Sequence, residues 1–109
     1  MKCKIQTKNI ELTESIKSYV EDKMNMLDKY LGNLSVVHCD VIIGTDGGHH
    51  NKGSIYKAEI NLDLPGEMLS VTKVEEDLYK AIDKVKDHLS QMIIKHKEKK
   101  IDKKRQSIS

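Results

Sequence analysis

The clearest hydrophobic pattern lies in the last third of the chain, between Glu75 and Arg105. Apolar side chains recur there with the period of an α-helix, about 3.6 residues. A polar stripe runs beside them and continues after the apolar stripe fades beyond Ile94. We therefore predict one long amphipathic helix. Its apolar stripe is Leu78, Ala81, Ile82, Val85, Leu89, Met92 and Ile93, and its polar stripe is Lys80, Lys84, His88, Gln91, Lys95 and Lys99.

A second amphipathic helix is predicted from Thr13 to Leu31. Thr13 is a favourable N-cap residue, and Glu14 follows it near the positive end of the helix dipole. Gly32 suits the left-handed conformation that often ends a helix. The apolar stripe of this helix is Ile16, Val20, Met24, Leu27 and Leu31, with Tyr19 and Tyr30 beside it.

Alternating apolar and polar positions predict four strands, at residues 2–8, 36–43, 55–64 and 67–73. Residues 44–54, rich in Gly, Asn and His, are predicted to form a loop. Pro65 and Gly66 fit the two central positions of a type II turn. The cleanest alternation is in 55–64, whose inward positions are Tyr56, Ala58, Ile60, Leu62 and Leu64.

The predicted order of elements is β-α-β-β-β-α, an α+β fold. A helix joins the first two strands, so these can pair in parallel through a right-handed crossover. The last three strands can form an antiparallel meander. Because each helix has one apolar stripe, we predict a four-stranded mixed sheet with two helices packed on one face and the other face in water.

Composition narrows the class of protein. The 109 residues suit one domain, and without Trp or Phe its core must be mainly aliphatic. No apolar run reaches the roughly 18 residues of a membrane span, and the first residues do not resemble a signal peptide. We therefore expect a cytoplasmic protein without a membrane partner.

Charge is distributed unevenly along the chain. Residues 95–109 contain seven Lys or Arg against two acidic residues, a net charge of +5, whereas the other 94 residues have 12 Lys against 15 acids, a net of −3. This asymmetry indicates a polyanion-binding end. An ordinary solvated face, balanced by Glu76, Asp83 and Asp87, is the alternative for the Lys stripe.

Lys23 interrupts the apolar stripe of the first helix. Its stem could pack while the ammonium reaches solvent. The ammonium could equally emerge between the two helices and meet a phosphate. The two interpretations are compatible.

Catalysis has little support in the sequence. His38, Cys39 and Asp40 are adjacent, but a strand directs Cys39 to the face opposite the other two. The loop of residues 44–53 lacks the Gly-Lys-Ser/Thr end of a phosphate-binding loop and leads into a strand. We predict that the protein is not an enzyme and needs no cofactor.

The cysteines and histidines give only a weak redox or metal signal. Cys3 and Cys39 lack Cys-x-x-Cys spacing and are interpreted as free thiols that pack as small hydrophobic side chains. A redox role for them stays open. A metal site of His38, His49 and His50 also stays open, but no characteristic spacing supports it, so no metal is predicted.

Two segments resemble the bacterial ribosome hibernation promoting factors, also called ribosome-associated inhibitor A or protein Y. The first includes Leu12-Thr13-Glu14-Ser15-Ile16, Tyr19-Val20-Glu21-Asp22-Lys23 and Leu27-Asp28-Lys29-Tyr30-Leu31. The second is Glu76-Asp77-Leu78-Tyr79-Lys80-Ala81-Ile82-Asp83, followed by Asp87, Leu89 and Lys95-His96-Lys97. The resemblance covers residues 1 to about 100.

The resemblance implies the same fold, similar in shape to double-stranded RNA-binding domains. It also implies a translation inhibitor that occupies the tRNA and mRNA channel of the small ribosomal subunit and promotes hibernation under stress. Contacts with rRNA would be mainly to phosphates. The rRNA-binding residues expected on this basis are Lys23, Lys80, Lys84, His88, Gln91, Lys95, Lys97, Lys99 and Lys100.

Two other residues are candidates for support of this surface. Tyr79 could offer its hydroxyl at the surface or pack in the core. Asp83 could orient Lys80 or Lys84, accept hydrogen bonds from RNA hydroxyls, or form an ordinary surface pair.

The second helix departs from the family pattern, and two of the departures remove cations. That pattern continues Asp-Lys-Leu-[Glu/Ala]-Arg-Gln, whereas this chain reads Asp87-His88-Leu89-Ser90-Gln91-Met92. His88 and Gln91 thus replace two cations on the face expected to meet RNA. The change bears on the strength of binding more than on its location.

Residues 1–100 are expected to be the ribosome-binding domain, and 101–109 a disordered basic tail or the start of a linker. Long members of the family continue into a C-terminal dimerisation domain that pairs two ribosomes. Dimerisation is expected here only if such a domain follows. Short form and amino-terminal part of a long form both stay open.

Two other functions stay open. One is a general double-stranded RNA-binding or RNA-chaperone module. The other is a homo-oligomeric scaffold that uses the exposed face of the sheet.

Overall fold

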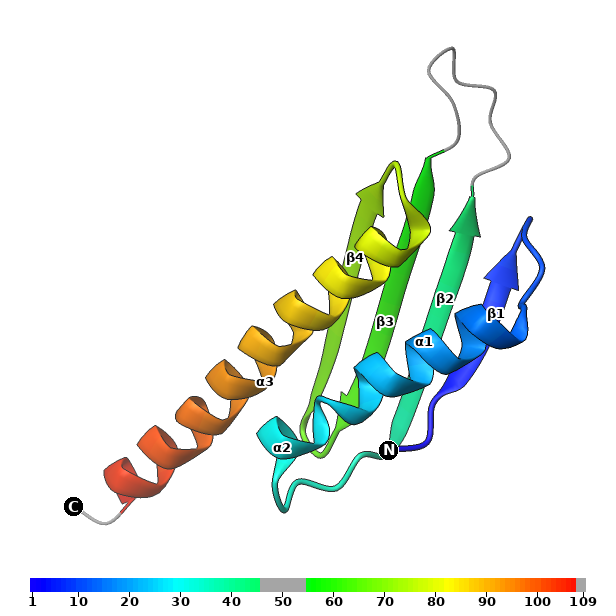
Figure 1. Ribbon diagram of the computed structural model, residues 1–109. Helices are drawn as coiled ribbons and strands as arrows, with labels where there is room; N and C mark the ends of the chain where they lie inside the picture. Colours follow the sequence, from blue (N-terminus) through cyan, green and yellow to red (C-terminus); the bar gives the residue numbers. More distant parts are fainter. Residues whose placement is uncertain (46–54, 108–109) are drawn as a thin grey trace.

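Four strands form one mixed sheet, and the helices lie on one of its faces (Figure 1). The computed structural model describes residues 1–45 and 55–107, with side chains as far as residue 99. The strand order is β1-β2-β3-β4, with β1 and β2 parallel and the other neighbours antiparallel. The predicted α+β fold is confirmed. The elements are β1 (Lys4–Lys8), α1 (Glu14–Asn25), α2 (Asp28–Leu31), β2 (His38–Thr45), β3 (Tyr56–Leu64), β4 (Glu67–Glu75) and α3 (Leu78–Ser107).

The two faces of the sheet differ as the alternation predicts. Inward side chains of β2, β3 and β4 are buried under the helices, and outward ones are polar or partly exposed. On the outer face, the Asn61 amide donates to Glu59 at 2.9 Å and the Ser70 hydroxyl donates to Asn61 at 2.7 Å. In the described part of the chain, the helices therefore lie on one face of the sheet.

The core is aliphatic, as composition requires, and α3 supplies much of it. Both predicted helical stripes lie against the sheet. Burial of this apolar surface is the main stabilising contribution to such a small domain. The largest fully buried side chains are Leu27, Ile43, Ile60, Leu62, Leu64, Leu89, Ile93, Val20, Val41 and Val85.

The first predicted helix is in fact two. Thr13 caps α1 as expected, accepting a hydrogen bond from the Ile16 amide at 3.2 Å. The helix ends at Asn25, where the Leu27 amide bonds to Met24 in a tighter turn at 3.0 Å. Leu27, which is wholly buried, and the buried Leu31 still face the core, as the predicted apolar stripe has them. Gly32 ends α2 with a positive φ of 57°, but its ψ of −119° lies outside the left-handed helical region that was predicted.

The strand boundaries shift by a few residues. β2 begins at His38 and reaches Thr45, two residues later at each end than predicted, and β4 extends to Glu75. β2 passes very close to β1 at Gly44, where a Cβ atom would lie 2.0 Å from the Lys8 carbonyl oxygen. Gly66 has a φ of 86°, which the third position of a type II turn requires.

The last helix is longer than expected. Instead of fraying after about residue 101, α3 is helical to Ser107, and its final turns extend past the sheet (Figure 1). Residues 95–107 contain no Gly or Pro and are mostly Lys, Glu, Gln and Arg, which favour helix. The longest dimension of the molecule is 59 Å. Within the described residues, no helix has an apolar stretch that could cross a bilayer.

Candidate nucleic-acid interface

The polar stripe of α3 forms an exposed row along a single helix. All six of its predicted members are exposed: Lys80, Lys84, His88, Gln91, Lys95 and Lys99. Because they project from one helix that is packed against the sheet, their backbone positions are fixed relative to one another. The row therefore offers a preorganised set of hydrogen-bond donors and positive charges.

Some of these cations have acidic neighbours on β4. Lys84 forms an ion pair with Glu75, and Lys99 lies 3.7 Å from Glu67. The hydrogen bond from Lys84 lowers the pKa of Glu75. Among the residues whose side chains are described, Lys80 and Lys95 have no acidic partner within 4 Å. The row thus keeps unneutralised positive charge at two of its positions, Lys80 and Lys95.

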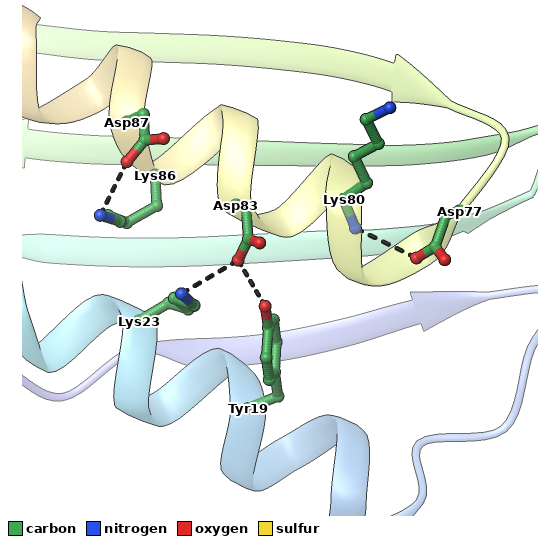
Figure 2. A network of polar contacts seen from close by, with 7 residues as sticks. All are labelled: Tyr19, Lys23, Asp77, Lys80, Asp83, Lys86 and Asp87. Atoms are coloured by element: carbon green, nitrogen blue, oxygen red, sulfur yellow. Dashed lines mark hydrogen bonds and ion pairs between the residues drawn. The ribbon is translucent and has the colours of Figure 1, made fainter.

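Lys23 lies between α1 and α3, where one of the two sequence interpretations places its ammonium. Its ammonium is 3.1 Å from an Asp83 oxygen and 5.2 Å from the centre of the Tyr19 ring (Figure 2). Its side chain is 22% exposed, so the stem packs while the charge stays near the surface. The ammonium is therefore positioned at the seam of the two helices.

Asp83 has different partners from those expected. Lys80 points away from it, and Lys84 pairs with Glu75 (Figure 2). Instead, Asp83 accepts a hydrogen bond from the Tyr19 hydroxyl at 2.5 Å in addition to the Lys23 contact. Asp83 thus orients a cation of α1, because it lies on the side of α3 that faces that helix.

The Asp83 carboxylate also affects the chemistry of Tyr19. The hydrogen bond to Asp83, followed by burial, raises the pKa of Tyr19 to about 12. Tyr79 packs edge-on against Tyr19, with 4.7 Å between ring centres, and is 39% exposed. Tyr79 therefore supports this cluster by packing, at the edge of the core.

Two of the expected rRNA-binding residues of α3 are not members of the exposed row. Lys97 is half-buried and donates a hydrogen bond to the backbone oxygen of Tyr30 at 3.1 Å, which ties α3 to α2. Lys100 belongs to α3, and its side chain lies outside the described part of the chain. The role of both in binding stays a prediction.

Sequence reasoning missed His96, which is 5% exposed. Its Nδ1 lies 2.5 Å from Glu67 at the start of β4, and this contact is the main cause of the lowered pKa of Glu67. The signal that could have found it is spacing, because His96 follows Leu89 by seven residues and Ile93 by three. It extends the buried face of α3 by one turn.

The described residues contain no group of three or more His, Cys, Asp or Glu side chains that could hold a metal. His49 and His50 lie outside these residues. Cys39 is buried on the inner face of β2, while His38 and Asp40 point to the outer face, as the strand pattern predicted. The three adjacent residues therefore do not converge on one site.

Most of the chain matches the model of a known family. The model of the family described as Sigma 54 modulation protein / S30EA ribosomal protein matches residues 3–101. The chain belongs to this family.

Curated relatives include ribosome hibernation factors. The ribosome hibernation promoting factor of Azotobacter vinelandii is 27% identical over 103 residues, which cover 94% of this chain and 89% of the relative. The ribosome hibernation promotion factor of Picosynechococcus is 32% identical over 105 residues, 95% of this chain and 53% of the relative. That of Deinococcus radiodurans is 28% identical over 90 residues, 83% of this chain and 46% of the relative. The chain thus spans about half the length of some of its relatives and most of others.

Solved structures agree in fold. The N-terminal domain of Thermus thermophilus protein Y superposes with a TM-score of 0.75 and is 32% identical, covering 88% of this chain and 99% of that domain. A ribosomal subunit interface protein from Coxiella burnetii superposes with a TM-score of 0.73 at 18% identity, covering 89% of this chain and 98% of that one. The second likeness concerns the fold alone.

Proposed function

We propose that this protein is a ribosome hibernation factor that binds the small ribosomal subunit. The observation that carries the proposal is the exposed row of cations on α3, with Lys23 beside it at the seam with α1. The named activity of several relatives supports it. The proposed rRNA contacts are those predicted from the sequence, with Lys80 and Lys95 as the most available charges.

Phosphate contact accounts for affinity without base recognition. Lysines that neutralise phosphates release condensed counterions, which makes binding favourable and sensitive to salt. Readers of single-stranded RNA stack bases on exposed aromatic rings. Here the rings of Tyr19 and Tyr79 pack edge-on against each other. The proposed surface therefore recognises the shape and charge of an RNA backbone.

Inhibition needs occupancy in addition to affinity. We propose that the domain fills the channel that tRNA and mRNA use, so that translation stops by steric exclusion. No covalent bond is made or broken in this scheme. In this scheme the protein inhibits translation by the position that it occupies on the subunit.

We propose the division of the chain into a binding domain, residues 1–100, and a basic extension after it. In this scheme the extension of α3 leads into a linker where a longer form exists. Pairing of two ribosomes would then depend on a C-terminal domain outside these 109 residues.

Competition tests the proposal. Labelled protein is titrated with small subunits, with subunits preloaded with mRNA and tRNA, and with plain duplex RNA of equal phosphate concentration. We expect tight binding to empty subunits only. Equal affinity for duplex RNA, or binding unaffected by mRNA and tRNA, would instead support a general RNA-binding module.

A further inference from the structure

Cys3, directly before β1, lies beside Cys39 of β2. β1 and β2 pair in parallel with Lys4 opposite Asp40, and the two cysteines directly precede these residues. Their sulfur atoms are 2.6 Å apart, and both thiols are free. Neighbouring strands run about 4.8 Å apart. That spacing lies within the range of Cα separations, about 4.4–6.8 Å, that a disulfide spans.

One of the two thiols is accessible from outside. A groove of about 500 Å³ lies between β1 and α1, and Cys3 lines it together with Lys2, Lys17 and Glu21. Cys3 is partly exposed, whereas Cys39 is 4% exposed and belongs to the core. A small reagent that enters the groove therefore meets Cys3 first.

The surroundings of the two thiols also give them different reactivities. The hydrogen bond with Cys39, and then the N-terminal ammonium, lower the pKa of Cys3 against an opposing effect of burial. The same hydrogen bond and burial raise the pKa of Cys39. Because the thiolate is the nucleophile, Cys3 is the thiol suited to attack and Cys39 the thiol suited to resolve.

We propose that Cys3 and Cys39 form an oxidisable dithiol that small hydroperoxides convert into an intramolecular disulfide between β1 and β2. The Cys3 thiolate attacks one peroxide oxygen, the O–O bond breaks, and the leaving hydroxide takes up a proton to become water, or an alcohol from an alkyl peroxide. Cys3 is then a sulfenic acid. The Cys39 sulfur attacks it, the S–O bond breaks, and a second water leaves with the Cys39 proton. Two thiols are oxidised by two electrons, and the peroxide is reduced.

The disulfide would secure the edge of the sheet. Among the strands of the described residues, β1 lies at the edge of the sheet with β2 as its neighbour. The crosslink would join residues 36 positions apart and so restrict the unfolded chain. We expect oxidation to raise the melting temperature by more than about 5 °C. This modification does not depend on ribosome binding.

The test uses the reduced, purified full chain and a slight excess of hydrogen peroxide. We expect both thiols to disappear, the intact mass to fall by two hydrogen atoms, and peptide mapping without reductant to show a Cys3–Cys39 link. The elution volume on gel filtration should not change on oxidation, and dithiothreitol should restore both thiols. Cys39→Ser should stop at a sulfenic acid on Cys3 that dimedone traps, and Cys3→Ser should react far more slowly.

Three results would overturn the proposal. One is that both thiols persist while a free cysteine in the same solution is oxidised. Another is that crosslinks form only between molecules. The third is that Cys3→Ser reacts as fast as Cys39→Ser, which would mean that the groove does not select Cys3. The wild-type result stands even if a Ser variant fails to fold.

Discussion

The Tyr19 hydroxyl of α1 donates a 2.5 Å hydrogen bond to the carboxylate of Asp83 on α3. The two residues are 64 positions apart in the chain, and their contact joins the helices that carry Lys23 and the cationic row. A hydrogen bond to a carboxylate is stronger than a neutral one. The relationship fixes how the α1 cation sits beside the α3 cations.

Tyr19 predicts a loss of stability at high pH. Its pKa is raised from 10 to about 12, so the fold favours the protonated phenol. That contribution is fully present below about pH 10 and is lost as the pH rises through about 12. We expect the free energy of unfolding of the wild type to fall more steeply over this window than that of Tyr19→Phe. Urea unfolding followed by circular dichroism at each pH measures it, and parallel curves for the two proteins would contradict it.

Glu67 predicts a loss of stability at low pH. The hydrogen bond with His96 lowers the pKa of Glu67 below its usual 4.5, so the fold favours the carboxylate. That contribution is present above about pH 4.5 and is lost as the pH falls through the lowered value. Glu67→Gln should therefore lose less stability on acidification than the wild type. Glu59→Gln, on the outer face of β3, is the matched control, and equal acid sensitivity of wild type and Glu67→Gln would refute the prediction.

The α3 row predicts the effect of charge reversal. Lys84→Glu combined with Lys95→Glu should weaken binding to small subunits at least ~100-fold, because hydrogen bonds to charged groups contribute about 1.5–3 kcal/mol each. Both side chains are exposed, so the circular dichroism spectrum should not change. Equilibrium titration at fixed salt measures the affinity. Wild-type affinity in the double variant would mean that α3 does not face the RNA.

The position of Lys23 predicts that its replacement weakens subunit binding more than replacement of Lys57 does. Lys23→Ala should weaken subunit binding about ten-fold if its ammonium meets a phosphate, since loss of one charged hydrogen bond costs about 1.5 kcal/mol. Lys57→Ala is the matched control, because Lys57 lies on β3 on the face away from the helices. The same titration compares the two variants. Equal losses would indicate that Lys23 only packs its stem and pairs with Asp83.

Elements with a strong period could be predicted from the sequence. In β3, Ala58, Ile60 and Leu62 alternate with polar residues and are buried as expected. In α3, Leu78 to Ile93 recur at helical spacing and face the sheet. Local order and burial follow from one-dimensional spacing in these cases, because a helix or strand directs every side chain from its position.

Features that depend on a tertiary neighbour could not be predicted. The sequence allows Asp83 to orient Lys80 or Lys84 of its own helix, but Tyr19 and Lys23 of α1 are its partners. The deciding contact comes from an element whose placement the local pattern does not contain. The break of the first helix after Asn25 also has no signal in the local pattern, because Leu27 and Leu31 continue the apolar stripe at helical spacing.

The exposed row of the candidate site could be predicted from the sequence, but the contact of Lys97 could not. Lys80 and Lys95 are exposed as the polar stripe predicts. Lys97 belongs by sequence to the same basic segment, yet it donates to Tyr30 of α2. The Lys97 side chain points toward α2 because α2 packs against α3. A count of charges along the sequence does not predict that contact.

The central claim is that the cations of α3 and Lys23 bind rRNA phosphates of the small subunit. The most direct measurement is co-sedimentation of the purified chain with small subunits over a series of salt concentrations. If about six phosphates are neutralised, the logarithm of the binding constant should fall with the logarithm of salt at a slope of roughly −4 to −5. Absence of co-sedimentation in dilute buffer, or a slope near zero, would contradict the account.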